Sequence, residues 1–139
     1  MQVLFPEHAL GTAEPLVVTG VTGAGDMLYV NYVDANHVSF GFDHWAVSSL
    51  SGPVVTVDYG RPHRLEIAMA SLYPPGEAGA WTRRVRVKLD GVGVLDGISA
   101  CHPSRIEEIQ IGKNLIGGSS CGPAFTGGIL SLARVPQAE

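Results

Sequence analysis

The chain has 139 residues, of which 45% are apolar and only 16% are charged, and it contains 18 glycines and 9 prolines. This length fits one domain with a core of its own, and so high an apolar content excludes an intrinsically disordered chain. The formal net charge of −4 argues against the cationic surface that nucleic acids and anionic membranes require. We therefore expect no nucleic-acid partner.

Strand-like segments recur along the chain and are separated by turn residues. In chain order, we expect strands at residues 16–21, 27–33, 37–43, 54–58, 63–72, 85–89, 108–112 and 128–135. Clusters such as Asp34-Ala35-Asn36 and Asp90-Gly91 predict the turns between them. Many short strands at regular spacing predict an all-β fold, specifically a two-sheet antiparallel β-sandwich.

The clearest alternation lies in residues 84–89, which read RVRVKL. Every second residue is apolar and every other one is basic, so one face of the strand is apolar and the other is cationic. We expect this strand to lie beside residues 63–72, with Glu66 opposite Arg86 as a favourable cross-strand pair. The basic run is interpreted as a solvated strand face.

Three motifs follow one another in the C-terminal half of the chain. They are an alternating strand with an Asp-Gly turn (RVRVKLDG), a strand that ends in Ile-Gly-x-Asn (EIQIGKN) and a final Phe-x-Gly-x-Ile strand (FTGGILSLARV). This order resembles the C-terminal half of concanavalin A-like jelly rolls, especially laminin-G-like domains. The resemblance implies a concanavalin A-like jelly roll that acts as a non-catalytic, lectin-like module with a glycan or protein ligand.

A second interpretation is a structural or protein-interaction domain of a larger surface or envelope protein, with no small-molecule site. The two interpretations differ in whether Trp45 and Trp81 are exposed on a groove or buried. The sequence leaves both open.

Two motifs raise the question of catalysis. The segment GSSCG at residues 118–122 formally matches a nucleophile elbow centred on Ser120, but a strand rather than a helix is expected to follow it. Glu107 and Glu108 are adjacent, so on a strand they would point to opposite faces and could not form the carboxylate pair of a glucanase. We expect the protein not to be an enzyme.

The most promising ligand-binding stretch is FGFDHW at residues 40–45. Alternation places Asp43 and Trp45 on one face of a strand end and His44 on the other. A carboxylate accepts hydrogen bonds from sugar hydroxyls, while an indole stacks on the apolar face of a sugar ring. We predict ligand contacts from Asp43, His44, Trp45 and Trp81, the last of which follows the Pro-Gly loop of residues 73–81. The alternative is that Trp45 closes the end of the core and Asp43 caps a turn.

No cofactor is expected from the sequence. The five histidines lack the paired spacing of a cupin metal site. Calcium stays open, with Asp26, Asp34, Asn36, Asp43 and Asp90 as candidate oxygen ligands. Each of these residues also stands where a turn would use it.

Two cysteines, Cys101 and Cys121, flank the expected strand at residues 108–112. A disulfide between them would close a loop of about 20 residues and contribute about 3 kcal/mol of stability. The alternative is a pair of small buried thiols. The spacing does not choose between the two.

The N-terminal residues contain no basic leader and no long apolar stretch, and Pro6 interrupts them, so we expect no signal peptide in this chain. No run of about 18 apolar residues occurs, so we expect no membrane insertion. We interpret residues 1–139 as one β-sandwich domain excised from a longer protein that is extracellular or part of the cell envelope.

Overall fold

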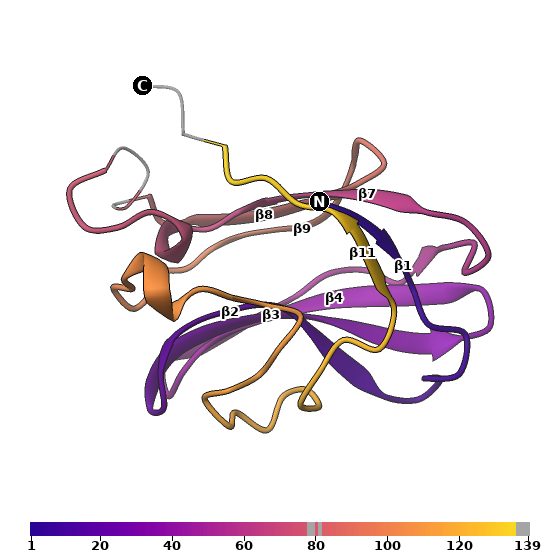
Figure 1. Cartoon of the computed structure of the whole chain (residues 1–139), viewed down its shortest axis with the longest axis horizontal. Coiled ribbons are helices and arrows are strands. Elements are labelled where there is room, and N and C mark those ends of the chain that lie inside the picture. The colour runs from indigo at the N-terminus through magenta and orange to yellow at the C-terminus, as the bar shows by residue number, and fades with distance from the viewer. Residues whose placement is uncertain (78–79, 81, 136–139) are drawn as a thin grey trace.

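Two antiparallel β-sheets pack face to face in the computed structural model, which describes residues 1–77, 80 and 82–135 (Figure 1). The five-stranded sheet has the order β11 (Gly128–Ser131), β1 (Gln2–Leu4), β7 (His63–Ala68), β8 (Arg84–Leu89) and β9 (Val92–Ile98). The six-stranded sheet has the order β10 (Gln110–Ile111), β2 (Ala13–Val21), β3 (Ala24–Asp34), β4 (His37–His44) and β5 (Ser48–Ser51), and β6 (Val55–Thr56) pairs with β4. The predicted two-sheet antiparallel sandwich is confirmed.

The core lies between the two sheets and is built by the alternation of the strands. Phe40 and Phe42 of β4 point inward, as do Val85 and Val87 of β8, and all four are buried. Burying a side chain of this kind contributes about 1.5–3 kcal/mol relative to leaving it exposed. The aromatic rings pack edge to face, with the centroid of Phe5 lying 6.5 Å from that of Phe40.

The hairpin between β8 and β9 forms as the sequence predicts. Asp90 and Gly91 have backbone φ angles of 51° and 84°, which is the geometry of the tight two-residue turn that Asp-Gly favours. The strand after this turn was not expected, because Asp96-Gly97 resembles a second turn. Gly97 instead lies inside β9, where a Cβ atom would come within 2.8 Å of the Leu50 side chain from the other sheet.

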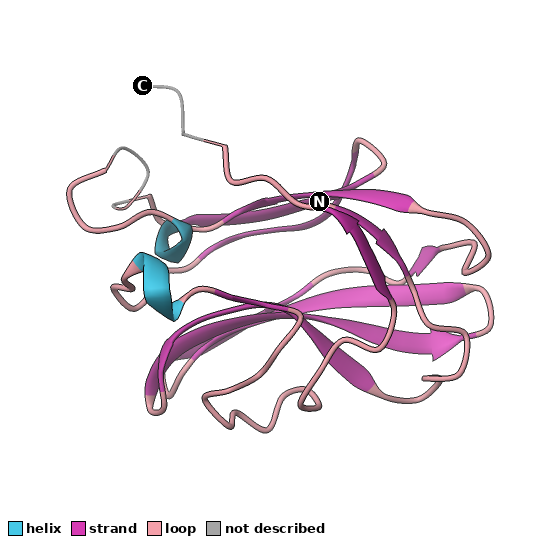
Figure 2. Cartoon of the chain, in the orientation of Figure 1, coloured by secondary structure: helices cyan, strands magenta, loops and turns pink. Residues whose placement is uncertain are grey.

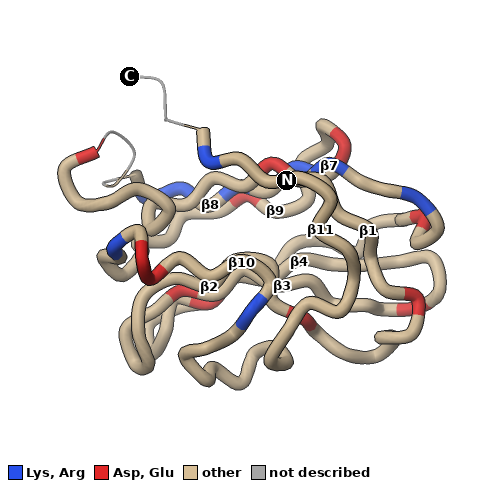
Figure 3. Tube along the Cα trace, in the orientation of Figure 1, with Lys and Arg blue, Asp and Glu red and all other residues tan. Residues whose placement is uncertain are grey.

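The basic face of β8 is paired differently from our expectation. Glu66 lies opposite Lys88 rather than Arg86. The predicted cross-strand pair is therefore wrong, because the true partner lies two residues further along β8. Arg86 lies opposite Asp96 on β9, and Arg84 donates two hydrogen bonds, of 2.7 and 2.6 Å, to the same carboxylate. The acidic partner of the basic residues of β8 (Figure 3) is therefore Asp96 on β9, which is the other strand of the same hairpin.

Two short 3-10 helices, η1 (Ala70–Leu72) and η2 (Ile106–Glu108), lie at the same end of the sandwich (Figure 2). The strand expected at residues 63–72 ends at Ala68 and continues into η1. Glu107 and Glu108 lie in η2 rather than on a strand, because Glu108 turns back to accept a hydrogen bond from the Arg105 backbone N–H at 2.9 Å. Within the described residues, no helix has the length and apolar content needed to cross a membrane.

The loop of residues 112–122 covers part of the outer face of the six-stranded sheet, as the orange segment in Figure 1 shows. Ile116 from this loop is buried against Val18 of β2 and Met27 of β3. This small apolar cluster, separate from the main core, holds the loop beside the end of β4. It thereby builds one wall of the candidate site.

Candidate ligand-binding site at the end of strand β4

The site begins where β4 ends, and strand alternation sets the direction of its side chains. Phe42 points into the core, so Asp43 points to the outer face of the six-stranded sheet. Asp43 is paired with Met27 on β3 and with Ser49 on β5. Its side chain therefore stands between an apolar neighbour and a hydroxyl.

A depression of about 430 Å³ opens at this position. Its walls are the β4–β5 turn, which includes Trp45 and Ser48, and residues 118–120 of the outer loop. Asp43, His44 and Trp45 are all among its lining residues, but only the side chains of Asp43 and Trp45 face it, because the His44 ring points to the other face of the sheet. Trp81 lies outside the described residues.

Trp45 is half-buried and forms an aromatic wall of this depression. Its indole packs against the outer apolar cluster, and Gly118 lets the loop approach closely, because a Cβ atom there would lie 3.2 Å from the ring. The ring is thus held in place while part of it stays exposed. A fixed, partly exposed indole suits stacking against an apolar ligand face.

The Asp43 carboxylate is partly desolvated, and this raises its pKa above the usual aspartate value. Across residues 1–77, 80 and 82–135, no hydrogen bond or ion pair satisfies this carboxylate, although most other carboxylates of the chain have one. Its charge also helps to raise the pKa of the nearby half-buried Tyr29, although burial of the phenol contributes more. Asp43 is therefore an acceptor without a protein donor, set beside aromatic rings.

The turn that carries Trp45 is strained. Ala46 has a φ of 62°, in the left-handed region that a residue with a Cβ atom rarely adopts. The turn is held by hydrogen bonds from Trp45 N–H to the Gly25 carbonyl at 3.0 Å and from Val47 N–H to the His44 carbonyl at 2.9 Å. Backbone strain of this kind persists where the surroundings fix it.

The His44 side chain points away from Asp43, although the residue lines the depression. Its ring lies on the inner side of the sheet, where Nδ1 is 2.7 Å from Asp26 Oδ1, and its centroid is 4.2 Å from that of His102. The sequence interpretation had placed His44 opposite Asp43 but had given it a ligand contact nonetheless. The imidazole is instead committed to a buried cluster.

The five candidate calcium ligands do not gather at one point. In the described part of the chain, the one group of three or more metal-ligating side chains is Asp26, His44 and His102. Asp34 accepts hydrogen bonds from the Asn36 backbone and from His37, as a turn residue does. The oxygen cage that calcium prefers is not assembled from these residues.

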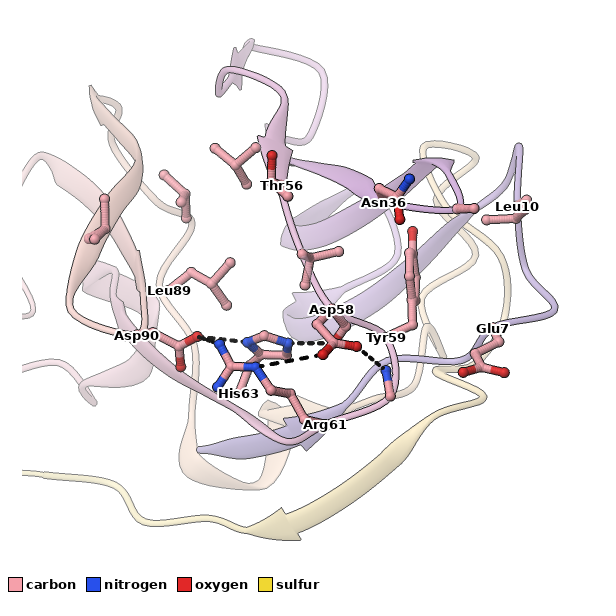
Figure 4. Close-up of a pocket in the computed structure, with 16 residues that line it drawn as sticks. Glu7, Leu10, Asn36, Thr56, Asp58, Tyr59, Arg61, His63, Leu89 and Asp90 are labelled. Atoms are coloured by element: carbon pink, nitrogen blue, oxygen red, sulfur yellow. Dashed lines mark hydrogen bonds and ion pairs between the residues drawn. The ribbon is translucent and has the colours of Figure 1, made fainter.

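A larger depression, of about 910 Å³, opens at the opposite end of β4, between the β8–β9 hairpin and residues 55–61 (Figure 4). The four charged or titratable groups His63, Asp90, Asp58 and Arg61 are paired with protein partners, whereas Glu7 also lines the depression and has no side-chain partner among the described residues. His63 Nδ1 lies 2.7 Å from Asp90 Oδ2, and His63 Nε2 lies 2.7 Å from the Asp58 carbonyl. Arg61 stands between the Asp58 and Asp90 carboxylates at 4.0 and 3.9 Å.

Each of these four groups therefore has a protein partner before any ligand arrives, and much of the remaining lining is aliphatic. The volume of this depression is about twice that of the Asp43 depression.

Both cysteines are free thiols. Of the two alternatives that the spacing left open, the disulfide is therefore not formed. Burial raises the pKa of Cys101, and burial together with the charge of Asp43 raises the pKa of Cys121 to about 11. Neither thiol is activated as a nucleophile, since both are held protonated at neutral pH.

Comparisons of the chain with protein families, with curated proteins and with solved structures each found no match. The site must therefore be interpreted from its own geometry. Sequence reasoning had missed Tyr29, which lies over the strand at Gly41, where a Cβ atom would collide with its ring. The signal for it was the pairing of Gly41 with a tyrosine across the β3–β4 hairpin.

Proposed function

We propose that this domain is a non-catalytic carbohydrate-binding module and that the depression at Asp43 and Trp45 is its binding site. The observation that carries the proposal is the Asp43 carboxylate, which is partly desolvated and has no hydrogen-bond donor among the described residues. The carboxylate is only partly buried, so water can donate to it in the free domain, and a ligand that supplies its own donors can take the place of that water.

Sugar hydroxyls are suitable donors for such a group. They are neutral, they occur in pairs that a carboxylate can bridge, and the ring that carries them has an apolar face for Trp45. Ser49, Ser119 and Ser120 line the same depression, and their hydroxyls can add donors and acceptors around the carboxylate. A depression of this size accommodates one or two sugar rings rather than a long chain.

The proposal is consistent with the resemblance to laminin-G-like and other concanavalin A-like domains, many of which bind glycans outside the cell. It does not depend on that resemblance. A site on the end of a rigid sandwich, formed by a turn and a loop, is where binding residues are commonly found.

The test is a glycan array probed with the wild-type domain and with Asp43→Asn, followed by calorimetry on the sugars that bind. Asp43→Asn keeps the shape of the side chain and removes the charge, so we expect affinity to fall by at least tenfold. Asp58→Asn is the matched control, since Asp58 is an exposed aspartate at the opposite depression. Loss of binding in Asp58→Asn and not in Asp43→Asn would place the sugar at the wrong end of the sandwich for this proposal.

A second candidate function is a protein-interaction or structural domain, and one observation favours it. The last described segment exposes several apolar side chains, namely Ile129, Leu130, Leu132 and Val135. Part of this segment is β11, which is the edge strand of its sheet and therefore has unpaired backbone groups. If no glycan binds on the array, this interpretation replaces the first.

A further inference from the structure

The balance of charges around the Asp43 depression indicates which ligands it can accept. Of the described residues that line the depression, only Asp43 presents a charged side chain to it, because the His44 ring is turned to Asp26 on the other face of the sheet. Many cations of the chain are engaged elsewhere. Six arginines lie within 4.0 Å of a carboxylate other than that of Asp43, namely Arg61, Arg64, Arg84, Arg86, Arg105 and Arg134.

The Asp43 carboxylate is therefore a partly buried charge that no neighbouring cation offsets. Burial raises its pKa, and no lysine or arginine acts in the opposite direction. Its charge in turn helps to raise the pKa of Tyr29 and of Cys121, although burial of each group contributes more. Glu7 and Glu107 also lack a side-chain partner among the described residues, but both are exposed to water. Asp43 gives the depression a negative potential that solvent screens only in part.

Aromatic rings stand beside this charge. Tyr29 and Trp45 are partly buried, and both pack against the outer apolar cluster of Val18, Met27 and Ile116. The face of an aromatic ring carries partial negative charge, so it attracts the same cations that a carboxylate attracts. Proteins use aromatic rings in this way to recognise organic ammonium groups. The depression thus combines two features that favour a positively charged ligand group.

We propose that the ligand of this depression is an amino sugar, whose free ammonium group is bound by the Asp43 carboxylate. This inference rests on the proposed carbohydrate-binding function and narrows its class of ligand. An ammonium group donates charge-assisted hydrogen bonds, which are about twice as strong as those between neutral groups. The apolar face of the same sugar ring can stack on Trp45, while the Ser49 hydroxyl can bond to the remaining sugar hydroxyls.

The same balance of charges excludes acidic sugars. A uronic, sialylated or sulfated glycan would bring its anion next to Asp43, and none of the described lining side chains is a cation that could neutralise it. Like charges that meet at a binding site suppress binding. The opposite depression differs in this respect, because Arg61 lies 4.0 Å from Asp58 and 3.9 Å from Asp90. Charge selection is therefore expected at the Asp43 end.

The test measures matched pairs of ligands by calorimetry. The ligands are disaccharides of glucosamine and of galactosamine, each with the counterpart that carries hydroxyls in place of the amines. At about pH 6.5 an amine with a pKa of about 8 is protonated. The wild type is expected to bind one of the amino disaccharides at least tenfold more tightly than its hydroxyl counterpart. This preference should disappear in Asp43→Asn and persist in the matched control Asp58→Asn, with circular dichroism to check that each variant is folded.

Three results would overturn this inference and leave the proposed function standing. The first is binding of glycans at Asp43 with no preference for the amine. The second is a preference for the amine that persists in Asp43→Asn, which would mean that the net charge of −4 attracts it elsewhere on the chain. The third is tighter binding of acidic glycans than of neutral ones. If no sugar binds, or if Asp43→Asn binds every sugar as the wild type does, the proposed function fails as well.

Discussion

The two ends of the sandwich each hold a buried histidine next to an aspartate at 2.7 Å, yet the two pairs differ in what they leave unsatisfied. At one end, both ring nitrogens of His63 lie 2.7 Å from a protein oxygen, so neither is left without a partner. At the other end, His44 has one acceptor and keeps a nitrogen with no partner among the described residues.

Burial separates the aspartates as well. The Asp26 side chain is completely buried, whereas the Asp90 side chain is 39% exposed. Desolvation dominates at Asp26 and raises its pKa. At Asp90, hydrogen bonds from His63 and the Arg64 backbone outweigh desolvation and lower the pKa. The same residue pair therefore has protein partners for both ring nitrogens at one end, whereas at the other end it is more deeply buried and leaves one ring nitrogen without a partner among the described residues.

The largest expected effect separates the two aspartates by stability. Asp26→Ala leaves His44 Nδ1 and the His102 N–H without an acceptor inside the protein, so we expect a loss of about 3 kcal/mol. Asp90→Ala should cost about 1 kcal/mol, since solvent reaches the groups that it leaves. Urea unfolding at pH 7 with a chelator present measures both values. Equal losses of stability in the two variants would contradict the proposed difference between the Asp26–His44 and Asp90–His63 pairs.

A smaller effect comes from the strained residue at each end. Ala46 and Asp90 both have positive φ angles, of 62° and 51°. Ala46→Gly should raise the free energy of unfolding by about 0.5–1 kcal/mol, because glycine adopts this conformation without steric cost. Asp90→Gly relieves similar strain but removes the hydrogen bonds to His63 and Arg64, so it should lower stability. Thermal denaturation measures the change in stability of each variant. A gain in both variants, or a loss in both, would contradict the predicted difference.

The smallest effect is a pH dependence at the His63 end. An aspartate with a lowered folded pKa stabilises the protein above its unfolded pKa of about 3.9, and that stabilisation is lost as the pH falls through the folded pKa. The stability advantage of the wild type over Asp90→Asn should therefore shrink between about pH 4 and pH 2. Because Asp90 is exposed to solvent, the change is expected to stay below about 1 kcal/mol. A stability difference between wild type and Asp90→Asn that stays constant over this pH range would show that the partners of Asp90 do not lower its pKa.

Part of the buried cluster could have been found from the sequence. The turn at residues 34–37 joins two predicted strands, and Tyr32 pairs with Val38 beside it. Counting six residues back along one strand and six forward along the other leads to Asp26 and His44. The predicted strands at residues 27–33 and 37–43 each stop one residue short of this pair, so the pairing of Asp26 with His44 was not predicted.

Other contacts depend on irregular segments that carry no periodic pattern. His102 lies 76 residues from Asp26 in the chain, on a loop whose path is set by packing at the end of the sandwich. The same holds for residues 118–120, which reach the depression because Ile116 is buried beneath them. Strand β9 was missed because Gly93 and Gly97 weaken its alternation, and β1 and β5 are too short to show a period.

The most direct test of the central claim is calorimetry of a sugar selected on the glycan array, with wild type, Asp43→Asn and Asp58→Asn side by side. The account predicts that the wild type and Asp58→Asn bind with the same affinity and that Asp43→Asn binds at least tenfold more weakly. Equal binding by all three proteins, or loss only in Asp58→Asn, would contradict the assignment of the ligand-binding site to the end of β4.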